Sequence, residues 1–211
     1  MVKINFDGTL FSKEKKFGIG MVAKDDNGSV LASCTKCLSQ AYSAIEIESM
    51  TATTALSFAH YIGIMQTILE GDSLAMIKVL KEDVHSLAPT SLLIEDVRIL
   101  SQNFDQLLYS HTKREGNSMA YSLTRYAIGI PDFLVWMEDV PPHIRSVLQV
   151  DLVCYINKVL IFPLKKKKKK KPQLTNHHYP IFQYKDGAIS LLAHLRKTLD
   201  TYYFLPLGAP L

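Results

Sequence analysis

The chain has 211 residues, of which 47% are hydrophobic and 21% are charged. These proportions are ordinary for a globular protein, and the length allows one domain with a proper core plus an extension. Residues 1–164 carry 14 basic and 18 acidic residues, whereas residues 165–211 carry 10 and 2. The formal net charge of +4 therefore belongs to the tail. The overall charge does not indicate a basic binding face on the folded part.

The sequence argues against secretory and membrane proteins. The first residues, Met1 to Asp7, lack the apolar core of a signal peptide. The late apolar run from Val147 to Leu164 is interrupted by charged residues, which are unfavourable at the centre of a membrane span. We therefore expect an intracellular protein, cytoplasmic or nuclear, with no membrane partner.

The cysteines favour a reducing compartment, because there are three of them and no secretory signal. Cys34-Thr35-Lys36-Cys37 has the C-x-x-C spacing, but no second pair or histidine cluster completes a zinc site. The pair also lies in a strand-like stretch, whereas a redox pair is expected at the start of a helix.

The first strand is predicted over residues 2–7, where apolar and polar residues alternate. The alternation places Asp7 on the face opposite Ile4 and Phe6, at the strand end where Gly8 allows a turn. A carboxylate in that place can hold a divalent metal ion. The alternative is an aspartate that only forms a turn before glycine.

Two further strands are predicted at residues 17–24 and 29–38, joined by Asn27-Gly28, a strong hairpin signal. A helix is predicted from Ser43 to Ile62, with Ser43 as its N-cap. Its apolar face consists of Ala44, Ile45, Ala52, Ala55, Ala59 and Ile62. Glu48 lies at the middle of that face, where a charge requires a metal ion or a partner. The alternative is a glutamate that reaches the rim or a buried partner.

The next strand is predicted at residues 65–69, followed by Glu70-Gly71-Asp72-Ser73. Asp72 stands at the carboxyl end of this strand, where open α/β sheets bind ligands. Alternatively, Asp72 is the N-cap of the helix that begins at Leu74.

The rest of the predicted domain contains a helix from Pro89 to Leu100, a strand at 104–110 and a last helix capped by Asn117. The order β-β-β-α-β-α-α-β-α predicts an α/β fold with a mixed sheet and helices packed on it. Pro141-Pro142 is predicted to end the domain, which then spans residues 1–142, with residues 132–140 docking back on it.

Residues 143–211 are predicted to be a poorly structured, lysine-rich extension. Seven consecutive lysines, Lys165 to Lys171, repel one another and are solvated. The same run is a candidate nuclear localisation signal.

Four stretches together resemble the ribonuclease H family of type 1, specifically the plant reverse-transcriptase-like domains derived from retroelements. The stretches are Asn5-Phe6-Asp7-Gly8, Glu48 with its alanines, Leu69-Glu70-Gly71-Asp72-Ser73 and His111-x-x-Arg114-x-x-Asn117-x-x-Ala120. Each motif alone is weak, and the specificity lies in their order and spacing over residues 2–140. The resemblance implies a five-stranded mixed sheet, three antiparallel strands and then two parallel, with helices packed on it.

The resemblance also implies a hydrolase, an endonuclease that cuts the RNA strand of an RNA–DNA hybrid with two Mg²⁺ (or Mn²⁺) ions. By resemblance, Asp7, Glu48 and Asp72 are catalytic residues and metal ligands. His111 matches a histidine that assists proton movement or product release, and Arg114 and Asn117 match substrate-binding positions. Two metal ions can activate a water and stabilise the leaving oxygen, and carboxylate oxygens suit Mg²⁺. A hybrid is distinguished from DNA by its 2′-hydroxyl groups.

One position departs from the family pattern. The fourth carboxylate of the family follows the alanine of the last motif, where this chain has Tyr121. Tyrosine is neutral at pH 7 and a poor ligand for Mg²⁺, so we expect weakened catalysis.

Three functions stay open: a metal-dependent hybrid ribonuclease, a catalytically inactive nucleic-acid-binding module, and a non-functional retroelement relic. Tyr121 favours the last two, whereas the presence of all three other carboxylates favours the first. The metal-site hypothesis requires that Asp7, Glu48 and Asp72 converge in space. The sequence leaves the oligomeric state open.

Overall fold

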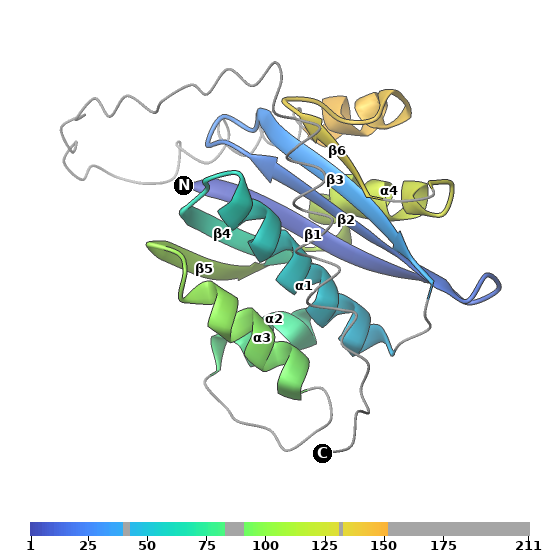
Figure 1. Cartoon of the computed structure of the whole chain (residues 1–211). Coiled ribbons are helices and arrows are strands. Elements are labelled where there is room, and N and C mark those ends of the chain that lie inside the picture. Colours follow the sequence, from blue (N-terminus) through green and yellow to red (C-terminus); the bar gives the residue numbers. More distant parts are fainter. Residues whose placement is uncertain (40–42, 83–90, 131–132, 152–211) are drawn as a thin grey trace. The chain divides into compact units, whose positions relative to one another are not determined.

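The computed structural model describes residues 1–39, 43–82, 91–130 and 133–151 (Figure 1). All of these residues belong to one compact unit. The predictions for the lysine run and the rest of the tail lie outside the described residues. Within the described ranges, no helix is both long enough and apolar enough to cross a bilayer.

The secondary structure of the described ranges agrees closely with the predicted order of elements. The strands are β1 (Val2–Phe11), β2 (Lys16–Lys24), β3 (Val30–Leu38), β4 (Gln66–Gly71), β5 (Gln106–His111) and β6 (Leu134–Met137). The α-helices are α1 (Ala44–Tyr61), α2 (Leu74–Lys81), α3 (Ser91–Ser101) and α4 (Ser118–Ala127). Two short 3-10 helices are η1 (Arg114–Asn117) and η2 (Pro142–Ile144), and residues 145–151 continue η2 as a helix.

The strands form one sheet in the order β5-β4-β1-β2-β3-β6. β1, β2 and β3 pair in antiparallel fashion. β4 pairs with β1 in parallel, and β5 pairs with β4 in parallel. This confirms the predicted mixed sheet. The strand count is six rather than five, because β6 pairs with the outer side of β3 in the segment predicted to dock back. β6 shows no alternation of apolar and polar residues, because all four of its residues are apolar.

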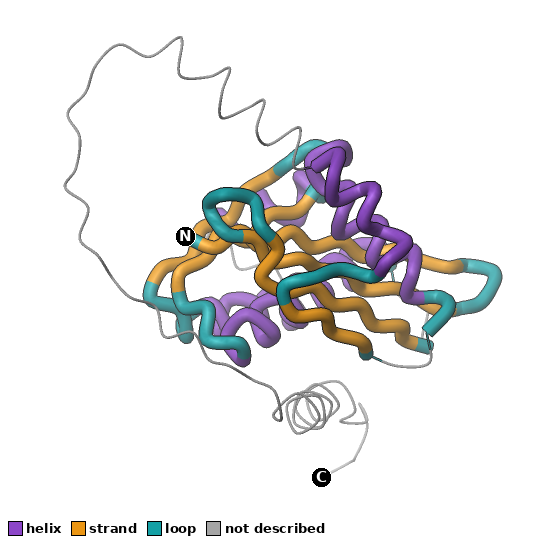
Figure 2. Tube along the Cα trace, turned by 90° about the horizontal axis from the view of Figure 1, so that it is seen from above, coloured by secondary structure: helices purple, strands orange, loops and turns teal. Residues whose placement is uncertain are grey.

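Helices cover both faces of the sheet (Figure 2). Two glycines allow these helices to lie close to the sheet. Gly8 on β1 faces α1, and a Cβ atom there would clash with the side chain of Ile47. Gly20 on β2 faces α4, and a Cβ atom there would meet the backbone oxygen of Ala120. The close approach of α1 to β1 and of α4 to β2 therefore requires glycine at both positions.

α1 is buried more widely than the single predicted stripe. Besides three alanines of the predicted stripe, its buried residues include Ile47, Met50, Thr51, Thr54, Leu56 and Phe58. The helix contacts β1 on one side and α3 on another, so more than one face is covered. The hydroxyl groups of Thr51 and Thr54 donate to the carbonyl oxygens four residues earlier, at 2.7 Å each, which satisfies them in the interior. Ser43 is the N-cap, as predicted, and forms a capping box with Glu46.

Residues 143–151 pack on the same unit, beyond the boundary predicted at residue 142. Ile144 joins a buried cluster with Val22, Val30, Met119, Leu123 and Val140. Lys24 on β2 and Asp151 form a largely buried ion pair, with Nζ 2.7 Å from Oδ2. The helix over residues 145–151 is therefore fixed to the sheet by both apolar packing and an ion pair. The character predicted for the remainder of the tail stays a prediction.

Candidate active site

Three carboxylates from separate elements meet beside the carboxyl end of β4. Asp7 comes from β1, Glu48 from α1, and Asp72 directly follows β4. One carboxylate oxygen of each residue lies within 4.8 Å of one from each of the others. The predicted convergence is confirmed.

The pairing of β1 with β4 explains why Asp7 and Asp72 meet. The strands are parallel, with Asn5 opposite Glu70, so the same register carried two residues further places Asp7 beside Asp72. Asp7 itself lies inside β1, which continues to Phe11, and not at the end of the strand as predicted. The prediction was wrong about Gly8 too, because this glycine forms no turn and instead admits α1, which carries Glu48.

Asp72 is not the N-cap of α2, although this was the structural alternative for its role. Ser73 holds that position, and its hydroxyl oxygen accepts a hydrogen bond from the Met76 backbone N–H at 3.4 Å. The carboxylate of Asp72 is therefore available to the cluster.

Asp7 is almost completely buried and is held by two hydroxyl groups. Its Oδ2 lies 3.2 Å from Oγ1 of Thr124 on α4 and 3.4 Å from Oγ1 of Thr9. Burial raises the pKa of Asp7 from its ordinary 3.8 to about 7, and the neighbouring Asp72 carboxylate adds to the rise. The two hydroxyls and Arg114 oppose this shift only in part.

Glu48 is in a less favourable position than Asp7. Its Oε2 is buried and has no hydrogen-bond partner among the described residues. Burial, followed by the charges of Asp7 and Asp72, raises the pKa of Glu48 from its ordinary 4.5 to about 8, and Arg114 opposes this rise only in part. A buried carboxylate oxygen without a donor is unfavourable, so something outside the described protein atoms is expected to satisfy it.

A hard divalent cation fits these three residues. Mg²⁺ and Mn²⁺ prefer oxygen ligands, and the site offers three carboxylates from three rigid elements. Their mutual repulsion and the unpartnered oxygen of Glu48 are what a bound cation would relieve.

His111 and Arg114 lie beside Asp72. The His111 Nε2 is 3.2 Å from the backbone oxygen of Asp72, and the ring is exposed. Nε of Arg114 is 3.9 Å from Oδ2 of Asp72, and the guanidinium stacks on the ring of Tyr121, 4.7 Å from its centroid. Both predicted residues thus stand at the rim of the carboxylate cluster.

Asn117 occupies the N-cap position of α4, as predicted, but makes no capping hydrogen bond. Its side chain is buried, and Nδ2 donates to the backbone oxygen of Phe6 at 2.8 Å. Asn117 therefore ties α4 to β1 one residue before Asp7. The substrate-binding role inferred from the resemblance stays a prediction.

Tyr121, at the position of the missing fourth carboxylate, is half-buried on α4. One helical turn further, the hydroxyl of Thr124 is the polar group of α4 that contacts Asp7. Sequence reasoning missed Thr124 and Thr9. The available signal was the place of Thr124, which follows Leu123 directly and lies four residues after Ala120 on the predicted apolar face of the helix.

A known family matches most of the folded unit. The model of the family described as "Reverse transcriptase-like" matches residues 5–127, a range that contains all three carboxylates as well as His111 and Tyr121. No curated protein matches the chain.

Solved structures with a similar fold include several ribonucleases H. RNase H1 from the halophilic archaeon Halobacterium salinarum is 23% identical, with a TM-score of 0.56, over 61% of this chain and 97% of that one. The N-terminal RNase H domain of a Mycobacterium tuberculosis protein is 22% identical, with a TM-score of 0.55, over 61% and 93%. LC11-RNase H1, solved in complex with an RNA/DNA hybrid, is 20% identical, with a TM-score of 0.56, over 61% and 97%. With this fold and a family match over more than half of its length, the chain belongs to the reverse transcriptase-like family of RNase H-like domains.

Proposed function

We propose that this protein binds RNA–DNA hybrids and cleaves their RNA strand weakly, in a reaction that depends on Mg²⁺ or Mn²⁺. The observation that carries the proposal is the convergence of Asp7, Glu48 and Asp72 within 4.8 Å, with a buried oxygen of Glu48 that has no partner in the part of the chain that the structure describes. A folded protein gains nothing from bringing three carboxylates together unless a cation joins them. The choice of substrate is supported by LC11-RNase H1, which has a similar fold and was solved in complex with an RNA/DNA hybrid.

Each residue of the site has a role in this proposal. Asp7, Glu48 and Asp72 would hold the metal ion, which when bound supplies Lewis acidity toward a phosphodiester. Thr124 and Thr9 orient the Asp7 carboxylate through its Oδ2. His111 is exposed beside Asp72 and is placed to carry a proton between the site and solvent.

Arg114 is the cation closest to the cluster among the described contacts, and its side chain is largely exposed. A guanidinium in that position suits a phosphate oxygen of the substrate, because its donors are fixed in a planar fork. The stacking of Arg114 on Tyr121 holds it there without a carboxylate at position 121.

The same feature favours a second candidate function, a nucleic-acid-binding module without catalysis. Tyr121 contributes an aromatic ring and a stacked cation where the family pattern has a metal ligand. Such a pair binds nucleic acid well and a second metal ion poorly.

A cleavage assay separates the two functions. A labelled hybrid is incubated with Mg²⁺ or Mn²⁺ and four proteins: wild type, Asp72→Asn, Tyr121→Asp and the double variant. The weak cleavage by wild type should disappear in Asp72→Asn. In Tyr121→Asp it should rise by about a hundredfold, because a restored metal ligand is expected to lower the activation free energy by a few kcal/mol and each tenfold in rate corresponds to about 1.4 kcal/mol. The gain must vanish in the double variant.

Binding without any cleavage, including by a folded Tyr121→Asp protein, would reject the nuclease and leave the binding module. Absence of both binding and cleavage would reject the two functions together.

A further inference from the structure

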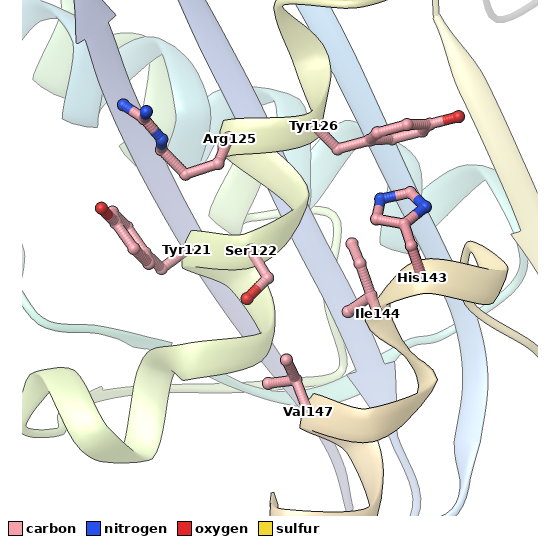
Figure 3. Close-up of a pocket in the computed structure, with 7 residues that line it drawn as sticks. All are labelled: Tyr121, Ser122, Arg125, Tyr126, His143, Ile144 and Val147. Atoms are coloured by element: carbon pink, nitrogen blue, oxygen red, sulfur yellow. The ribbon is translucent and has the colours of Figure 1, made fainter.

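A groove lies on the outer side of α4, between this helix and the segment that follows β6 (Figure 3). Its lining residues come from these two elements: Tyr121, Ser122, Arg125, Tyr126, His143, Ile144 and Val147. Tyr121 and Arg125 lie on one side of the groove, and Tyr126, His143 and Ile144 on the other. Its volume is about 390 Å³, near the lower end of the range of about 300–1,000 Å³ for small-molecule sites. A duplex does not fit in this space, whereas one or two unpaired nucleotides do.

The walls of the groove present aromatic faces and a cation. The rings of Tyr126 and His143 are in contact, with centroids 4.2 Å apart and planes at 48°. Arg125 is exposed and its guanidinium stacks on the ring of Phe11, 5.3 Å from the centroid. No acidic side chain is among the lining residues. Aromatic faces with arginine and without carboxylates are the chemistry that binds single-stranded nucleic acid.

The groove adjoins the carboxylate cluster through Tyr121. Tyr121 is one of the lining residues, and the Arg114 guanidinium that stacks on its ring also lies 3.9 Å from Asp72. A strand that passes the carboxylates therefore meets Arg114 and Tyr121 before it reaches Arg125. Residues 143–147, which form one wall, lie outside the range 5–127 that matches the family model.

We propose that this groove binds the unpaired nucleotides of a single-stranded extension on the hybrid, with a base stacked on the Tyr126–His143 pair and a phosphate at Arg125. The inference rests on the proposed function, since the hybrid places the extension beside the groove. It adds a substrate preference, for hybrids that carry a single-stranded extension over blunt hybrids.

Equilibrium binding of the full chain tests this preference. Fluorescence anisotropy is measured with two labelled probes, a blunt hybrid and the same hybrid with a four-nucleotide extension, in Ca²⁺, with the probes checked for integrity on a gel. The extension should tighten binding by about tenfold, as expected for one stacked base and one phosphate contact. In the double variant Arg125→Ala/His143→Ala the extended and blunt probes should bind alike.

Lys81→Ala is the matched control, because it removes an exposed positive charge at the end of α2, outside the groove. This variant should keep the full gain from the extension. An equal gain in wild type and in the double variant would overturn the groove proposal, as would the absence of any gain in wild type with normal binding of the blunt hybrid. Failure of wild type to bind either probe would overturn the proposed function itself.

Trp136 provides a second readout that reports on the groove alone. It is the single tryptophan of the chain, and its ring centroid lies 6.1 Å from that of Tyr126. Binding of the extended probe should change its fluorescence, while binding of the blunt probe should leave it unchanged. The same change with both probes would contradict a base stacked beside Tyr126.

Discussion

The carboxylate cluster and the groove on α4 lie on two sides of Tyr121 and are built in opposite ways. The cluster gathers three carboxylates, two of them with strongly raised pKa values, and none of the described residues donates a hydrogen bond to the buried Oε2 of Glu48. The groove instead holds its cation, Arg125, in an exposed position, stacked on Phe11.

The carboxylates of the cluster repel one another and are held together by the surrounding fold, whereas the side chains of the groove have no such repulsion to overcome. The cluster exists because β1, α1 and β4 pack for reasons of their own and keep the carboxylates together. It therefore destabilises the protein in the absence of a cation. The groove gathers no like charges, and its exposed side chains Arg125 and His143 can change with little effect on folding, whereas Ile144 also belongs to the core. Measurements of stability can test this contrast without any assay of activity.

The largest expected effect is a loss of stability of the metal-free protein as the pH rises from 4 to 8. The folded-state pKa values of Asp7 and Glu48, about 7 and about 8, lie above their ordinary values of 3.8 and 4.5. Between these limits the folded protein binds more protons than the unfolded chain, so the free energy of unfolding falls as pH increases. At about 1.4 kcal/mol per pKa unit, one such group alone contributes about 4 kcal/mol, so we expect a fall of at least that size, measured by urea unfolding in chelator.

Asp7→Asn should make this profile much flatter, whereas Arg125→Ala should leave it unchanged. A profile that rises with pH over the same range would contradict the destabilising role of the cluster.

The ion pair between Lys24 and Asp151 should be the next largest contribution. Asp151→Asn leaves Lys24 buried without its charged partner, which we expect to lower the free energy of unfolding by about 3 kcal/mol. Because the pair fixes the helix over residues 145–151, the variant should also lose the preference for extended hybrids. Metal binding at the carboxylates should persist in Asp151→Asn. Its loss would mean that the carboxylate cluster depends on the helix over residues 145–151.

Mg²⁺ or Mn²⁺ should stabilise the folded protein, because the cation binds only when the carboxylates are assembled. At a concentration one hundred times the Kd, the gain is about 2.7 kcal/mol. Calorimetric melting with metal and with chelator measures it. Asp7→Asn should abolish the rise in melting temperature that the metal causes, whereas His143→Ala should keep it. An equal rise in both variants would mean that the cation binds at another site.

The smallest effect concerns the groove. Arg125→Ala and His143→Ala should each change the free energy of unfolding by less than about 0.5 kcal/mol, as is usual for exposed side chains. A larger loss of the free energy of unfolding, measured by chemical denaturation, would show that these two side chains contribute to the core.

The three carboxylates could be predicted from the sequence because each has a weak local pattern and the patterns together have the order and spacing of a known family. Asp7 follows an alternating strand, Glu48 interrupts an apolar helix face, and Asp72 stands after a short strand. The same patterns could not show that Gly8 makes room for α1 and does not form a turn. The need for glycine there comes from a helix much later in the chain. The wide burial of α1 was missed for a similar cause, because α3 covers a side that periodicity alone treats as exposed.

The groove could not be predicted from the sequence. Its walls come from α4 and from residues 143–147, which show no strand or helix pattern strong enough to place them. The position of Thr124 on the apolar face of α4 could be read from the sequence, but its contact with Asp7 could not, because that contact depends on how closely α4 lies on β2 at Gly20. Each of these features depends on contacts between segments far apart in the chain.

The sixth strand has a consequence for how the protein behaves in a crowded solution. β3 is nine residues long, and without a neighbour its free N–H and C=O groups would form an open edge. β6 pairs with residues 32–35 of β3 and presents a strand of only four residues to the outside. At the opposite edge, β5 is six residues long. Short terminal strands are poor templates for edge-to-edge pairing, so β6 protects the domain from aggregation.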